Sequence, residues 1–93
     1  MQTATVLLVE DDADLRAEVK DYLAAEGYKV LEASSLQSSM EMLQNQTVGA
    51  LVLDAGLPDG NSLFSLPEIR RLTNCPIVMM TAWGQLSQRL QGY

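Results

Sequence analysis

Four short apolar runs divide the chain, and each ends at a polar or turn-forming residue. They are Thr5–Val9, Tyr28–Ala33, Ala50–Leu53 and Pro76–Met80. Runs of this length with such boundaries are typical of strands buried in a sheet. The run from Tyr28 is more polar than the others, which predicts a strand nearer to an edge of the sheet.

Between these runs, apolar residues recur at the spacing of amphipathic helices. The inward positions are Leu15, Val19, Tyr22 and Leu23 in the first helix, Leu36, Met40 and Leu43 in the second, and Leu63, Leu66, Ile69 and Leu72 in the third. The predicted caps are Asp12 or Asp14, Ser34 or Ser35, and Asn61 or Ser62, with Gly27 ending the first helix. Pro67 predicts a kink in the third helix, or a first turn displaced toward the proline.

Strands and helices alternate as β-α-β-α-β-α-β, and Leu86 and Leu90 indicate the start of a fourth helix. This order predicts an α/β fold in which helices cover both faces of a parallel sheet. A doubly wound sheet of strand order 2-1-3-4 makes the first, third and fourth strands neighbours. Ninety-three residues form one domain.

The composition narrows the possible chemistry. A formal charge of −6 with six basic residues argues against a nucleic-acid or anionic membrane surface. Histidine is absent from the sequence, which excludes Ser-His and Cys-His nucleophile systems and leaves carboxylates as the reactive groups. The single cysteine, Cys75, excludes an internal disulfide and is expected in or near the core. The sequence shows no secretory signal or membrane-spanning run, so we expect a cytoplasmic protein.

Three strand ends carry the candidate chemistry: Glu10 and Asp11 after the first strand, Asp54 after the third, and Thr81 after the fourth. The carboxyl ends of parallel strands meet at one edge of the sheet, so these residues are expected to share a pocket. Clustered carboxylates hold Mg²⁺ or another divalent cation, and a carboxylate can also attack phosphorus. Taken alone, Asp54 fits equally well as a turn former or helix cap.

The residues that carry a family resemblance stand in three segments: LLVEDD at 7–12, LDAGLPDG at 53–60 and MTA at 80–82. With this spacing, essentially the whole chain resembles the receiver domains of bacterial two-component response regulators, which have a flavodoxin-like fold. The resemblance implies phosphorelay signalling, in which Asp54 accepts a phosphoryl group from a sensor histidine kinase. It implies that Asp11 ligates Mg²⁺ directly and Glu10 through water, with Asp54 and the backbone carbonyl of Gly56 completing the metal site. Thr81 would hydrogen-bond the phosphoryl group and move toward it.

Trp83 stands where side chains of this family influence access to the acyl phosphate. The resemblance therefore suggests that Trp83 shields the site, while simple packing explains its position equally well.

The resemblance stops at Tyr93, before the family's fifth strand, its lysine and its fifth helix. It therefore implies a receiver over 1–93 that is incomplete at its C-terminal end. A fourth strand left at the sheet edge predicts a homodimer or a strand-exchanged oligomer. An output domain, commonly one that regulates transcription in this family, would follow in a longer regulator.

Two other classes of function stay open. One is a phosphorylation-independent interaction or dimerisation module, favoured by the missing lysine and opposed by the acids and Thr81. The other is a metal-dependent hydrolase or nuclease that uses Glu10 and Asp54. Enzymes of this class that have a similar sheet carry a second Asp two residues after the first. The position two residues after Asp54 is Gly56 in this chain, so we do not expect an independent enzyme.

Overall fold

The computed structural model describes residues 4–80, and of residues 62 and 63 the backbone alone. The strands are β1 (Thr5–Val9), β2 (Lys29–Ala33), β3 (Ala50–Asp54), β4 (Gly56–Leu57), β5 (Gly60–Asn61) and β6 (Ile77–Met80). The helices are α1 (Ala13–Ala25), α2 (Leu36–Asn45) and α3 (Ser62–Leu72). The expectations for Thr81, Trp83, Leu86 and Leu90 lie outside the described residues.

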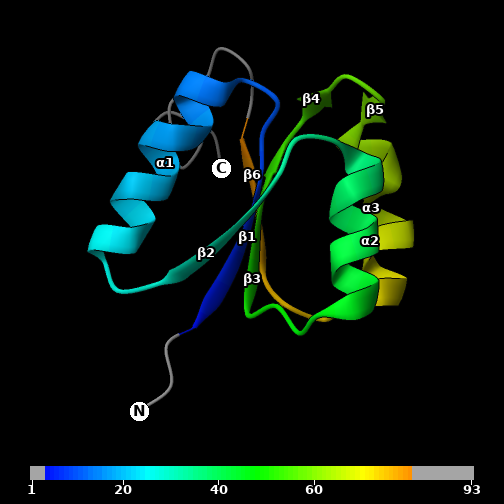
Figure 1. Ribbon diagram of the computed structural model, residues 1–93. Coiled ribbons are helices and arrows are strands. Elements are labelled where there is room, and N and C mark those ends of the chain that lie inside the picture. Colours follow the sequence, from blue (N-terminus) through cyan, green and yellow to red (C-terminus); the bar gives the residue numbers. More distant parts are fainter. Residues whose placement is uncertain (1–3, 81–93) are drawn as a thin grey trace.

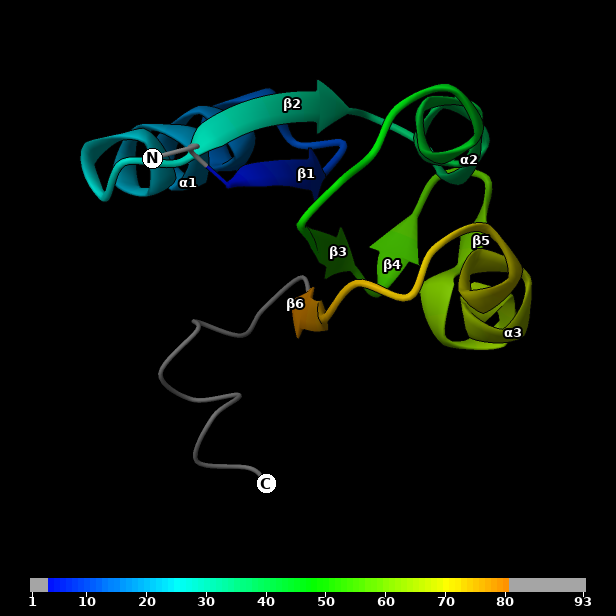
Figure 2. The same cartoon turned by 90° about the horizontal axis from the view of Figure 1, so that it is seen from below.

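The main sheet has four parallel strands in the order β2-β1-β3-β6. Helix α1 covers one face of this sheet, while α2 and α3 lie together on the other face (Figures 1 and 2). The predicted doubly wound α/β fold is therefore confirmed, with β6 as the fourth strand of the predicted order. The more polar strand β2 lies at one edge, as its sequence indicates.

Side chains of each central strand alternate between two apolar layers. Leu7 and Val9 of β1 pack with Leu51 and Leu53 of β3 on the side of α2 and α3. Val6, Leu8, Val52 and Met80 form the layer beneath α1, with Val19 and Leu23 of the helix packed against it. Burial on both faces explains why these strands are continuously apolar rather than alternating in sequence. Cys75 is buried in the first layer, as predicted.

Helix α1 is the least buried of the predicted elements. Asp12 is its N-cap and Gly27, with φ of +98°, follows its last turn, as the sequence indicates. The inward assignment of Tyr22 is wrong, because this residue is 61% exposed. Tyr22 precedes Leu23 by one residue, or about 100° around the helix, and Leu23 takes the position against the sheet.

Helix α3 begins at Ser62 and contains Pro67 five residues later. The alternative of a first turn displaced to the proline is therefore wrong. Ile69 is fully buried, and Leu66 and Leu72 pack against the same apolar layer. The predicted inward positions Leu66, Ile69 and Leu72 are therefore confirmed, while the side chain of Leu63 lies outside the described part of the chain.

A short antiparallel pair of strands, β4 and β5, was not predicted. It pairs Gly56 with Asn61 and Leu57 with Gly60 around the expected turn at Pro58 and Asp59. The carboxylate of Asp59 accepts hydrogen bonds from the backbone N–H groups of Leu36 (2.9 Å) and Gln37 (3.0 Å). Asp59 therefore fastens the segment that follows β3 to the first turn of α2, where a negative charge is stabilising.

The two N–H donors lower the pKa of Asp59 below its usual 3.8. Ionised Asp59 therefore stabilises the fold at neutral pH, and this contribution is lost as the pH falls below that value. We expect Asp59→Asn to lower the thermal midpoint by a few degrees at pH 7, and by less as the pH approaches 3. Asp21→Asn, at an exposed position of α1, is the matched control. Equal midpoints for the two variants at pH 7 would contradict this role of Asp59.

Candidate functional site

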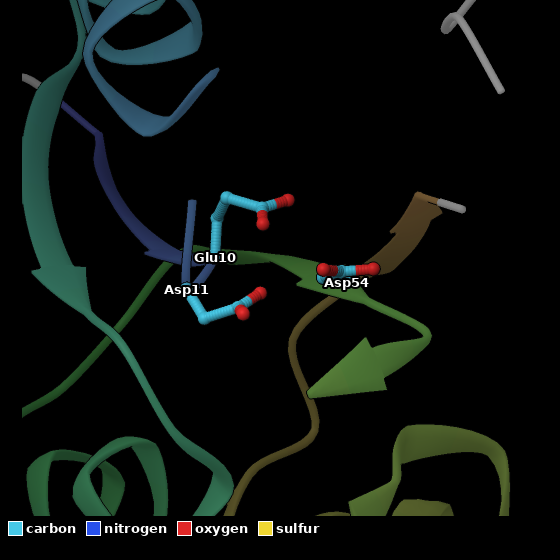
Figure 3. Close-up of side chains that lie close together, drawn as sticks. All are labelled: Glu10, Asp11 and Asp54. Carbon is cyan, nitrogen blue, oxygen red and sulfur yellow. The ribbon is translucent and has the colours of Figure 1, made fainter. Parts of the chain in front are cut away.

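Strand register brings the acidic residues together. Val9 pairs with Leu53 and Asp54 pairs with Met80, so the residue after β1 and the last residue of β3 meet at one edge of the sheet. Carboxylate oxygens of Glu10, Asp11 and Asp54 lie within 4.8 Å of one another (Figure 3). The pocket predicted from the strand ends therefore exists for these three acids, while Thr81 lies beyond the described residues.

Backbone hydrogen bonds fix the first side of this pocket. The N–H of Glu10 donates to the carbonyl of Ala33 in β2 (3.0 Å), and the N–H of Asp12 donates to Glu10 Oε2 (3.0 Å). The carboxylate of Asp12 accepts hydrogen bonds from the N–H groups of Asp14 and Leu15. Of the two predicted caps, Asp12 is therefore the one used, and Asp12 takes part in helix capping rather than in the acidic cluster.

The second side of the pocket is the turn after β3. The N–H of Gly56 donates to Asp54 Oδ1 (3.1 Å), and the N–H of Ala55 donates to the carbonyl of Met80 (2.7 Å). Asp54 is 2% exposed, and Glu10 likewise is 2% exposed. Asp11, the third acid of the cluster, is exposed. The site thus combines two buried carboxylates with one that faces solvent.

Burial controls the electrostatics of the site. The pKa of Glu10 is raised from 4.5 to about 7, mainly because burial removes water from its carboxyl group, and the neighbouring carboxyl groups of Asp54 and Asp11 contribute to the rise. The N–H of Asp12 acts in the opposite direction and favours the ionised form. Near neutral pH, Glu10 therefore holds a proton for part of the time and thereby relieves the repulsion among the three acids.

This donor set fits a hard divalent cation. Three carboxylates within reach of one point supply the oxygen ligands that Mg²⁺ prefers, and the exposed side of Asp11 leaves room for the waters that Mg²⁺ retains. A cation would also offset the repulsion that raises the pKa of Glu10.

Sequence reasoning missed Arg16, which contacts the site from α1. Its Nη1 donates to the carbonyl of Glu10 (2.8 Å) and its Nε donates to Glu32 Oε1 (3.1 Å). A lone arginine in the first turns of an amphipathic helix gives little signal in sequence, because such residues usually form the solvated face. Its distance of six residues from Glu10 becomes informative only when the turn between them is known.

The comparison with protein-family models decides the family. The model described as "Response regulator receiver domain" matches residues 6–93. The chain belongs to the response regulator receiver family. Members of this family act in two-component phosphorelay signalling, and the receiver described here is assigned to that process.

Individual relatives agree with this assignment. The receiver is 34% identical over 87 residues to the transcriptional regulatory protein CpxR of Klebsiella pneumoniae, a match that covers 94% of this chain and 37% of CpxR. The non-phosphorylated HemR receiver domain of Leptospira biflexa is 30% identical, with a TM-score of 0.78 over 97% of this chain and 73% of that one. A CheY-like receiver of Methanospirillum hungatei superposes with a TM-score of 0.83 at 23% identity, covering 96% and 72% of the two chains.

The receiver spans a little over a third of the length of CpxR. Within residues 4–80, no helix has the length and apolar character needed to cross a bilayer.

The raised pKa of Glu10 predicts how stability depends on pH. Between about 4.5 and 7 the folded state binds more protons at Glu10 than the unfolded state, so the free energy of unfolding contributed by this group falls as the pH rises. We expect Glu10→Gln to remove this slope. Urea unfolding of both proteins from pH 5 to 8 in the presence of a chelator measures the difference.

Other acids of the chain titrate in both proteins, so the difference between the wild type and Glu10→Gln isolates Glu10. A stability difference that stays constant across this pH range would show that the pKa of Glu10 is not raised.

Proposed function

We propose that the receiver accepts a phosphoryl group on Asp54 from a phosphohistidine of a sensor histidine kinase, in a reaction that requires Mg²⁺. The observation that carries this proposal is the meeting of Glu10, Asp11 and Asp54 within 4.8 Å at the carboxyl edge of the sheet. The family match supplies the class of reaction, and the acidic pocket supplies the residues.

In the proposed reaction, a carboxylate oxygen of Asp54 attacks the phosphorus atom. A new O–P bond forms while the N–P bond of the donor breaks, and its electron pair stays on the histidine nitrogen. The N–H of Gly56 orients the carboxylate through Asp54 Oδ1. Near-complete burial of Asp54 excludes water, which favours transfer to the carboxylate.

The transferred group brings negative charge beside Glu10 and Asp11. A bound Mg²⁺ supplies the charge neutralisation that this transfer needs. Asp11 would hold the cation directly and Glu10 through water, with Asp54 and the backbone carbonyl of Gly56 as further ligands. Glu10 would hold the cation in its ionised form, because an ionised carboxylate is the better partner for a metal.

Thr81 is proposed to hydrogen-bond the phosphoryl group. It follows Met80 directly in sequence, and Met80 pairs with Asp54 in the sheet and accepts the N–H of Ala55. Movement of a hydroxyl next to this strand end would couple phosphorylation to a change of surface.

The domain as a whole is assigned to residues 1–93, as a cytoplasmic signalling module rather than an independent enzyme. The name of CpxR describes a transcriptional regulator, and we extend a regulatory output of this kind to the present chain as part of the proposal. The burial of Glu10 and Asp54 and their clustering with Asp11 favour a phosphoacceptor domain over a phosphorylation-independent interaction module.

Intact mass spectrometry after incubation with Mg²⁺ and a small acyl-phosphate donor tests the proposal. We expect one added phosphoryl group on the wild type and on Asp21→Asn, and none on Asp54→Asn. Omission of Mg²⁺ is expected to abolish the addition. A folded wild type that gains no mass, or an Asp54→Asn variant that gains it, would contradict the assignment of Asp54.

The edge of the sheet supports a second proposal, that two copies of the chain associate through β6. This strand is the outermost of the described sheet on the side opposite to β2, and Val78 within it is 42% exposed. Strand edges of this type pair with other chains, and a lysine on such an edge opposes pairing.

We therefore expect a concentration-dependent dimer in sedimentation velocity and a shift to monomer in Val78→Lys. Phe64→Lys, at an exposed residue of α3, is the matched control and is expected to dimerise like the wild type. A wild type that stays monomeric at all concentrations would refute the proposal.

A further inference from the structure

Arg16 joins three elements next to the acidic pocket. From α1 it donates through Nη1 to the backbone carbonyl of Glu10 (2.8 Å) and through Nε to Glu32 Oε1 of β2 (3.1 Å). Lys20, one turn further along α1, holds the other oxygen of Glu32 at 3.1 Å. The guanidinium is therefore held by a carboxylate on one side while it holds a backbone carbonyl on the other.

The contact with Glu10 fixes the orientation of a peptide group. The carbonyl of Glu10, the N–H of Asp11 and the Cα of Asp11 lie in one plane because the peptide bond is planar. A hydrogen bond that fixes this carbonyl therefore restricts the direction in which the Asp11 side chain leaves the backbone. On the other side of Glu10, its N–H is fixed by the carbonyl of Ala33 (3.0 Å). Glu10 is thus held at both of its backbone polar groups.

The bonded groups of Arg16 also determine its electrostatic role. Its guanidinium donates to a backbone carbonyl and to Glu32, whereas the clustered oxygens belong to Glu10, Asp11 and Asp54. The positive charge therefore lies beside the acidic cluster without occupying the carboxylate oxygens that would bind a cation. The side chain is 23% exposed, so its field is less screened by solvent than that of a free surface arginine.

We propose that Arg16 is a positioning residue for the divalent-cation site: it aligns the Glu10–Asp11 peptide so that the Asp11 carboxylate faces Asp54. This inference rests on the proposed function, because it concerns the metal site of that function. Arg16 acts through the backbone of Glu10 and touches neither the cation nor the transferred group.

Two substitutions separate this role from a general contribution to stability. Arg16→Gln removes the charged guanidinium group. Arg16→Lys keeps the positive charge but replaces the guanidinium group, which bonds both Glu10 and Glu32, with a single amine. Lys20→Gln is the matched control, because it breaks the other ion pair of Glu32 and leaves the contact with Glu10 in place. Exposed ion pairs of this kind contribute little to stability.

The measurement is isothermal titration calorimetry of the metal-free full chain with MgCl₂, at one pH and ionic strength. Residues that orient metal ligands from outside typically change metal affinity by about 10- to 100-fold. We expect Arg16→Gln to raise the dissociation constant about tenfold, Arg16→Lys to raise it by less, and Lys20→Gln to leave it within about twofold of the wild type.

Phosphorylation by a small acyl-phosphate donor gives a second readout. In Arg16→Gln, the Mg²⁺ concentration for half-maximal rate should rise by the same factor, while the rate at saturating Mg²⁺ is retained. A stability defect alone would not separate these two quantities in this way.

Each outcome is decisive. Equal Mg²⁺ affinity of Arg16→Gln and the wild type would overturn the inference and leave the proposed metal site intact, and so would equal weakening in Lys20→Gln. A folded wild type that binds no Mg²⁺ would instead overturn the metal site of the proposed function, and this inference with it. If Arg16→Gln does not fold, Arg16→Lys decides alone, and wild-type affinity in that variant would refute the role of Arg16.

Discussion

Mutual repulsion of three carboxylates is the constraint on which the rest of this structure depends. Glu10, Asp11 and Asp54 lie within 4.8 Å of one another, and two of them are nearly inaccessible to water. A flexible chain would separate such charges. Here they stay together because each is attached to the end of a strand that is buried on both faces, and the packing of those strands fixes the positions of the strand ends. Partial protonation of Glu10 relieves the repulsion without movement of the backbone.

The segments that border the pocket are not stabilised by strand pairing alone. The turn after β1 is held by Arg16 of α1, and the turn after β3 is held by Asp59, which bonds the N-terminus of α2. Both contacts run from a charged side chain to backbone groups of a different element. Helices on opposite faces of the sheet therefore each fasten one side of the site, α1 on the first turn and α2 on the second (Figure 1).

The difference between buried strands and single side-chain contacts explains how far the sequence could predict the structure. Burial dictates apolar runs and helical spacing, so strand order, the core faces of α2 and α3, and the meeting of Glu10, Asp11 and Asp54 could be predicted. The contact of Asp59 with Leu36, 23 residues away, leaves no periodic signal in the sequence. A single Asp in a turn has the same sequence pattern whether it bonds its own turn or a distant helix. Tyr22 was misassigned for a related reason: helical spacing placed both Tyr22 and its neighbour Leu23 on the inward face, and packing against the sheet shows that Leu23 alone of the two lies there.

The two anchors also differ in a way that bears on signalling. Arg16 holds the backbone carbonyl of Glu10, beside the acids that are proposed to bind the cation. Asp59 instead ties the segment after Asp54 to α2, so a change at Asp54 would first reach a turn that is bonded to that helix. The turn after β1 is thus held by Arg16, whereas the segment that follows Asp54, the proposed phosphoacceptor, is linked through Asp59 to α2. A switch needs this asymmetry, because a fixed reference on one side allows a displacement on the other to be passed to the surface.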